Sequence, residues 1–212
     1  MEIMFQYFKS NNSKGSLMNT DFIIGISGNA RSGKDTFCEL AKVALSEKKV
    51  PAARVAFADQ IKEDLDRLCR HNIGCSAFTS DDEEKSLIRP LLVAYGTDVM
   101  RKMEPNWWIE KLEFKLPLYK EQGIVPIVTD VRYENELEWI RKNDGVCVHI
   151  SRDGIGPANS EEESNNLILE KKADYTLSWP TFGSDSMKLG GEYIDKIVED
   201  IYNTKIQCAL QT

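Results

Sequence analysis

Short apolar runs alternate along the chain with segments whose apolar residues recur every three or four positions. The runs predict five strands, at 22–26, 53–57, 124–129, 146–151 and 174–178. Strands that alternate with helices are typical of a parallel sheet covered by helices on both faces. The pattern therefore predicts an α/β fold with a mostly parallel five-stranded sheet, in one domain over 21–212. The first 20 residues are expected to form a flexible extension.

Helical spacing predicts helices over 37–45, 58–70, 83–103, 105–116 and 193–202, and a short one from residue 160. Pro90 is expected to kink or divide the third of these, because proline lacks the N–H that a helix interior needs. Gly96-Thr97-Asp98 is expected to interrupt the same helix. Residues 179–189 are expected to form a loop.

The strongest chemical signal follows the first strand. Gly28 and Gly33 bound a loop that ends in Lys34, and a helical pattern begins directly after it. Glycines let successive N–H groups turn inward around phosphate oxygens, and the helix start adds its positive dipole end. A strand, a glycine-bounded loop with Gly-Lys, and a helix together indicate a phosphate-binding loop, with Lys34 reaching the β- and γ-phosphates of a nucleoside triphosphate.

One position departs from the usual loop. A Ser or Thr that binds magnesium normally follows the lysine, whereas this chain has Asp35 there and Thr36 one place later. Asp35 could hold magnesium directly or through water, or could only stabilise the helix start. Thr36 is then expected to contact the α-phosphate.

Polar residues follow two other strands. Lys62 lies in the first turn after the second strand, and Asp130 and Arg132 follow the third. Open α/β sheets bind ligands at the carboxyl ends of their strands, so Asp130 could orient magnesium and Arg132 could clamp a phosphate. The alternatives are a solvated lysine and a structural Asp–Arg pair that caps the next helix. Trp107 and Trp108 are more often core anchors than base-stacking platforms.

Composition narrows the function classes. The 212-residue chain is 42% hydrophobic and 29% charged, and its net charge of −7 argues against bulk nucleic-acid binding while leaving room for a local basic pocket. Five cysteines without paired metal spacing indicate reduced thiols, and the presence of only two histidines argues against a zinc site. No apolar run approaches the roughly 18 residues of a membrane span, and no signal peptide is evident.

Several motifs occur together in one order. The loop Ser-Gly-x-x-Arg-Ser-Gly-Lys-Asp-Thr is followed by Tyr-Gly-Thr-Asp with a downstream Trp, by Thr-Asp-Val-Arg-x-x-x-Glu and by Ala-Asp-Tyr-Thr-Leu. In these motifs the chain resembles the deoxynucleoside monophosphate kinases of tailed bacteriophages, from about Ile23 to its end. The Gly-Lys-Asp-Thr variant is itself a feature of that family.

The resemblance implies a three-layer αβα P-loop nucleoside-kinase fold that moves the γ-phosphoryl group of ATP, with Mg²⁺, to a deoxynucleoside 5'-monophosphate. It implies ATP binding by Gly28, Asn29, Ala30, Arg31, Ser32, Gly33, Lys34, Asp35 and Thr36, with Asp35 the expected metal ligand. It places the acceptor at Ile61, Lys62, Arg89, Gly96, Thr97, Trp108, Asp130, Arg132 and Glu136. The catalytic residues would be Arg31, Lys34, Asp130 and Arg132.

The chain departs from the family pattern at three places, and other functions are left as alternatives. Ala30 and Pro90 stand where a well-known member has a lysine and an arginine, and 153–166 lacks a histidine that many relatives carry. The alternatives are a phosphomevalonate or dephospho-coenzyme A type of kinase, a nucleotide-binding regulatory protein without activity, and an ATPase acting on nucleic acid. Small-molecule substrates, a homodimer, no membrane or nucleic-acid partner, and a cytoplasmic location, that of the host if phage-encoded, are expected.

Overall fold

A central parallel sheet organises the protein. The computed structural model describes residues 20–179 and 186–207. Its strands are β1 (Ile24–Ser27), β2 (Ala52–Val55), β3 (Val125–Val131), β4 (Val146–Arg152) and β5 (Tyr175–Trp179). They lie in the order β2-β3-β1-β4-β5, and every pairing is parallel. This confirms the predicted α/β class and the five strands, although β2 ends before Phe57.

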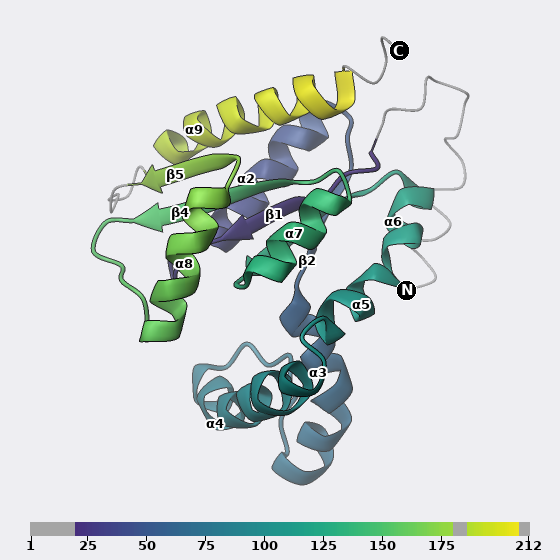
Figure 1. The fold of residues 1–212 in the computed structure, drawn as a ribbon, viewed down its shortest axis with the longest axis vertical. Coiled ribbons are helices and arrows are strands. Elements are labelled where there is room, and N and C mark those ends of the chain that lie inside the picture. The colour runs from purple at the N-terminus through teal and green to yellow at the C-terminus, as the bar shows by residue number, and fades with distance from the viewer. Residues whose placement is uncertain (1–19, 180–185, 208–212) are drawn as a thin grey trace.

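Helices cover both faces of this sheet, which makes three layers (Figure 1). Helices α2 (Lys34–Glu47) and α9 (Ser186–Ile201) pack together on one face. Helices α7 (Glu134–Lys142) and α8 (Ser160–Lys172) cover the other. Each face buries its own apolar cluster, because successive strand residues point to opposite sides. The π-helical turn η3 (Tyr202–Gln207) follows α9.

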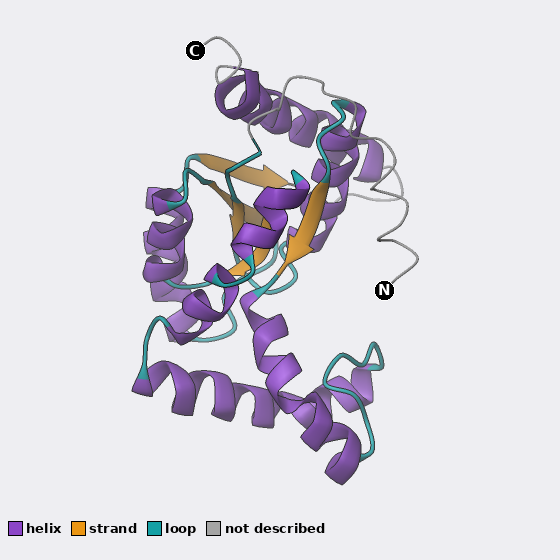
Figure 2. Ribbon diagram, turned by 90° about the vertical axis from the view of Figure 1, so that its right-hand side faces the viewer, coloured by secondary structure: helices purple, strands orange, loops and turns teal. Residues whose placement is uncertain are grey.

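A helical arm projects from the carboxyl edge of the sheet (Figures 1 and 2). It consists of α3 (Phe57–Leu68), the π-helical turn η1 (Cys69–Ile73), α4 (Asp82–Val93) and the π-helical segment η2 (Ala94–Arg101). A small apolar cluster of its own, centred on Leu65, Cys69 and Ile88, holds the arm together. Helices α5 (Trp107–Glu113) and α6 (Leu116–Gln122) then return the chain to the sheet.

The structure differs from the prediction at two places in this arm: Pro90 does not divide the helix, and Gly96–Asp98 does not end the helical path. Helix α4 passes through Pro90 and continues into η2, where Gly96–Asp98 was expected to interrupt it. Pro90 lacks the N–H that would bind the carbonyl of Ser86, and both residues are exposed, so this carbonyl lies where water can reach it. Gly96 lies close to α3: a Cβ there would lie 2.5 Å from Ile61 Cδ1, so a larger residue would displace the Ile61 side chain.

Two boundaries also differ from the prediction. The helix expected over 105–116 is two helices, because Pro117 begins a new first turn where its missing N–H costs nothing. Trp179 is the last residue of β5 and not part of a loop, and α9 begins at Ser186. The predicted extension over 1–20 lies outside the described residues except for Thr20, which is buried.

The described cysteines are buried free thiols. Cys38, Cys69, Cys75 and Cys147 form no disulfide, as expected for reduced thiols, while Cys208 lies outside the described residues. Burial raises the pKa of Cys38 to about 11 and that of Cys147 to about 12, which keeps both thiols protonated at neutral pH. No helix within 20–179 and 186–207 is long and apolar enough to cross a membrane.

Candidate active site

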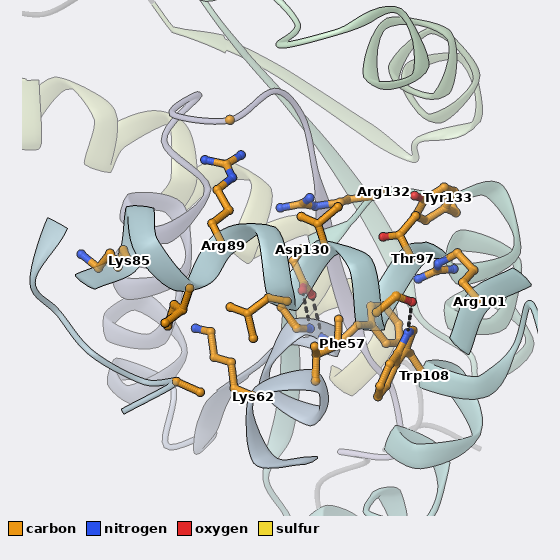
Figure 3. Close-up of a pocket in the computed structure, with 18 of the residues that line it drawn as sticks. Phe57, Lys62, Lys85, Arg89, Thr97, Arg101, Trp108, Asp130, Arg132 and Tyr133 are labelled. Atoms are coloured by element: carbon orange, nitrogen blue, oxygen red, sulfur yellow. Dashed lines mark hydrogen bonds between the residues drawn. The ribbon is translucent and has the colours of Figure 1, made fainter. Parts of the chain in front are cut away.

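A cleft of about 450 Å³ lies between the carboxyl edge of the sheet and the helical arm (Figure 3). Its apolar wall comes mainly from α3, α4 and α5, and includes Ile61, Leu92 and Trp108. Its polar wall carries the cations Lys62, Lys85, Arg89, Arg101 and Arg132. A cleft of this size with an apolar side and several convergent charges is typical of a small-molecule site for an anionic ligand.

The structure brings together every residue that the resemblance assigns to the acceptor. Ile61, Lys62, Arg89, Gly96, Thr97, Trp108, Asp130, Arg132 and Glu136 all line this one cleft. They come from six elements, α3, α4, η2, α5, β3 and α7, and from the turn after β3. Of the predicted ATP-binding loop, only Ala30 lines the cleft, so the rest of the loop lies beyond its mouth.

The loop between β1 and α2 has the backbone of a phosphate cradle. Gly28 and Gly33 have φ angles of 134° and 98°, in the left-handed half of the map that side chains disfavour. Arg31 also has a positive φ, 65°, although it is not glycine. Because α2 begins at Lys34, its first N–H groups have no acceptor within the helix and face the loop. This geometry fits a polyphosphate.

Lys34 folds back across the loop. Its Nζ donates to the carbonyls of Gly28, at 2.9 Å, and Asn29, at 2.6 Å. Burial lowers the pKa of Lys34, and the charge of Arg132 lowers it further. Lys34 and Arg132 repel each other, so an anion bound between them would stabilise both charges. A phosphoryl group in transfer is such an anion.

The C-terminal part of the sheet holds this loop in place, which the sequence did not predict. Trp179 at the end of β5 donates from Nε1 to the carbonyl of Ser32 at 2.7 Å, and a Cβ on Gly33 would lie 2.6 Å from its ring. From α8, Glu162 Oε1 accepts from the N–H of Ala30 at 3.1 Å, and the amide of Asn166 donates to Asn29 Oδ1. Only the aromatic character of Trp179 hinted at this role.

Asp130 has a structural task at the floor of the cleft. Its two carboxylate oxygens accept from the N–H groups of Phe57 and Ala58, both at 2.8 Å (Figure 3). It therefore caps α3, the helix after β2, and not the helix that follows it in the chain. Burial raises the pKa of Asp130, while the two N–H donors and Arg132 oppose the shift. By fixing the start of α3, Asp130 also positions Ile61 and Lys62.

Glu136 is fully engaged by protein partners. It is 1% exposed, and its Oε1 accepts from Arg101 Nη2 at 2.7 Å. Its Oε2 accepts from the N–H groups of Arg132, at 2.7 Å, and Tyr133, at 3.1 Å. Burial raises the pKa of Glu136, and the charge of Arg101 is the largest opposing influence. Arg101 and Tyr133 were not predicted as site residues.

Arg89 and Arg132 are the free cations of the cleft. Within 20–179 and 186–207 neither side chain has a hydrogen-bond or ion-pair partner, whereas Lys62, Lys85 and Arg101 each pair with a carboxylate. Figure 3 draws the guanidinium groups of Arg89 and Arg132 on the same side of the cleft. Unpaired guanidinium groups are suited to bidentate binding of phosphate.

The residues that could hold a metal are few. Among the described residues no group of three or more His, Cys, Asp or Glu side chains forms a metal site. The Asp35 side chain is 86% exposed, with Arg54 Nε 3.7 Å from its Oδ1. One carboxylate beside a phosphate loop fits Mg²⁺, which usually takes one or two carboxylates and completes its shell with phosphate oxygens and water.

Comparison with known proteins identifies the family. The family model for phosphomevalonate kinase matches residues 26–145, more than half of the chain. The chain belongs to the phosphomevalonate kinase family. It is therefore a P-loop kinase, in agreement with the loop, the cleft and the parallel sheet described above. No curated protein matches the chain.

Two solved structures align with most of this chain at low identity. The APS kinase of Mycobacterium tuberculosis in complex with AMPPNP and APS is 13% identical, with a TM-score of 0.44 over 84% of this chain and 97% of that one. The protein TT1252 from Thermus thermophilus is 16% identical, with a TM-score of 0.42 over the same shares.

Proposed function

We propose that this kinase transfers the γ-phosphoryl group of ATP to a deoxynucleoside 5'-monophosphate and releases the diphosphate and ADP. The observation that carries the proposal is the convergence of Arg89 and Arg132 beside the loop, next to an apolar wall that ends at Trp108. The two arginines suit the acceptor phosphate, and the apolar wall suits a flat base. The family match supports phosphoryl transfer and leaves the acceptor to be tested.

The residues would divide the work as follows. Gly28 to Thr36 would bind the ATP phosphates, and Asp35 would hold Mg²⁺, which neutralises charge on the β- and γ-phosphates when bound. Lys34, Arg31 and Arg132 would stabilise the charge that develops on the transferring group. The acceptor's phosphate oxygen attacks the γ-phosphorus while the bond to the β,γ-bridging oxygen breaks, so positioning matters more than covalent catalysis.

A second acceptor is favoured by a specific finding. The matching family model is that of phosphomevalonate kinase, and phosphomevalonate is also a small phosphorylated anion. Its carboxylate would suit Lys62 or Lys85 at the far end of the cleft, although it has no flat group for the wall formed by Ile61 and Leu92. The apolar wall is the reason to place the deoxynucleotide first.

A single assay separates these acceptors. ADP release from ATP and Mg²⁺ would be measured with dGMP, dTMP, dCMP, dAMP, their ribose counterparts, and phosphomevalonate. We expect turnover with at least one deoxynucleotide and none with phosphomevalonate. Lys34→Met serves as the control, because it should abolish the signal if the activity belongs to this protein. Turnover with phosphomevalonate alone would overturn the proposal, and ATP binding without turnover on any acceptor would favour a regulatory protein.

A further inference from the structure

A buried ion pair joins the helical arm to the cleft. Arg101 ends η2, and its Nη2 lies 2.7 Å from Glu136 Oε1 in α7. The two side chains are 16% and 1% exposed. Burying two charges costs desolvation free energy, which their attraction offsets only when the remaining hydrogen-bonding atoms also have partners. The second carboxylate oxygen of Glu136 has such partners, the N–H groups of Arg132 and Tyr133. The pair is therefore a built contact and not an incidental surface bridge.

The second oxygen of Glu136 holds the turn that follows β3. It accepts from the N–H groups of Arg132 and Tyr133, so one carboxylate sets the backbone of two successive residues. The Arg101 guanidinium also lies over the Tyr133 ring, 4.0 Å from its centroid. Arg101 thus fixes this turn twice, through Glu136 and by stacking.

The position of this turn decides where Arg132 points. Its side chain has no hydrogen-bond or ion-pair partner among the described residues, so the backbone of this turn sets where the guanidinium lies, beside the charge of Asp130. A guanidinium on a turn that shifts by about 1 Å loses its alignment with the transferring phosphoryl group.

We propose that Arg101 is a positioning residue that orients Arg132 for phosphoryl transfer, through the carboxylate of Glu136 and the ring of Tyr133. Arg101 couples the arm to catalysis without being the group that stabilises the transferring phosphoryl. This inference rests on the role proposed for Arg132 and adds a residue that neither the loop nor the acceptor motifs contain.

A double-mutant cycle on turnover tests the proposal. We expect Arg101→Met to lower kcat by on the order of tenfold to a hundredfold while the KM for ATP changes by less than about threefold. In an Arg132→Ala background the same change should lower kcat by no more than about threefold, because the group that it positions is gone. The control is Lys102→Met at the adjacent position, where the lysine is exposed and pairs with the exposed Asp98. It should leave kcat unchanged.

A conservative variant guards against misfolding. Arg101→Lys keeps the charge opposite Glu136 but loses the planar stack on Tyr133. It should retain most of the thermal stability and still lower kcat, and it replaces Arg101→Met in the cycle if that variant does not fold. Equal losses of kcat with and without Arg132 would overturn the proposal, as would lower stability with kcat unchanged.

Hydrogen exchange gives a readout that does not depend on the acceptor. The amides of Arg132 and Tyr133 should exchange faster in Arg101→Lys than in the parent protein, while those of β1 stay protected. Unchanged exchange at these two amides would overturn the positioning role even if the acceptor differs from the one proposed. Faster exchange combined with full activity of Arg132→Ala would instead refute the role of Arg132.

Discussion

At the scale of single residues, the phosphate loop has a strained backbone angle at Arg31, a residue proposed to act in phosphoryl transfer. Arg31 holds a φ of 65°, and a non-glycine residue in this region costs on the order of 1–2 kcal/mol. Such outliers persist where the surrounding structure imposes them, which is often at functional sites. Arg31 is exposed and does not line the cleft, so its proposed role requires it to turn toward bound ATP.

Replacing Arg31 tests that role. If this arginine stabilises the transferring phosphoryl group, Arg31→Ala should lower kcat by on the order of a hundredfold or more. The matched control is Arg67→Ala, since Arg67 is an exposed arginine near the end of α3. Steady-state ADP release measures both variants. Unchanged turnover in Arg31→Ala would assign this side chain to the solvent.

At the scale of elements, the phosphate loop depends on chain that lies far away in sequence. The end of β5 and the start of α8 supply its contacts through Trp179, Glu162 and Asn166. Parallel pairing brings β4 next to β1 and β5 next to β4, so their carboxyl ends gather around the loop. The ATP site is thus assembled by the sheet as a whole and not by one strand, loop and helix.

Changing Trp179 should weaken ATP binding. Trp179→Phe removes the hydrogen bond to the Ser32 carbonyl, and a net loss of about 1 kcal/mol corresponds to roughly fivefold weaker binding. Trp179→Ala also removes the ring packed on Gly33 and should weaken binding by more than about tenfold. Isothermal titration with ATP measures both variants. Trp107→Phe in α5, whose Nε1 has no hydrogen-bond partner in the described part of the chain, should bind ATP like the parent. An equal effect there would contradict this account.

At the scale of the whole molecule, the described chain has a sheet body and a helical arm with separate apolar clusters. Ile127 lies in the cluster between the sheet and α2 with α9, and Ile88 lies in the cluster of the arm. The cleft lies between body and arm, so the acceptor-binding residues come from both. A movement of the arm would change the distance between Arg89 and Arg132.

The two clusters should respond differently to truncation. Ile127→Ala removes packing from the centre of the sheet and should lower the free energy of unfolding by about 2–5 kcal/mol. Ile88→Ala should raise hydrogen exchange mainly in α3 and α4, because the arm can open without the sheet. Val43→Ala, at a 58% exposed position, serves as the control and should change stability by no more than about 0.5 kcal/mol. Equal loss of protection throughout the chain in Ile88→Ala would show a single cooperative unit.

The sequence by itself determined the local features of this protein. Its apolar runs predicted five parallel strands, and Gly28, Gly33 and Lys34 predicted a phosphate loop, because strand burial and glycine turns depend on neighbouring residues. The motifs also named acceptor residues that the structure brings into one cleft. Only the tertiary structure decided what the carboxylates of Asp130 and Glu136 bind, since their partners at Phe57 and Arg101 are 73 and 35 residues away. The roles of Trp179 and Arg101 were not predicted either, because they consist of contacts between elements that are far apart in sequence and meet only in the folded protein.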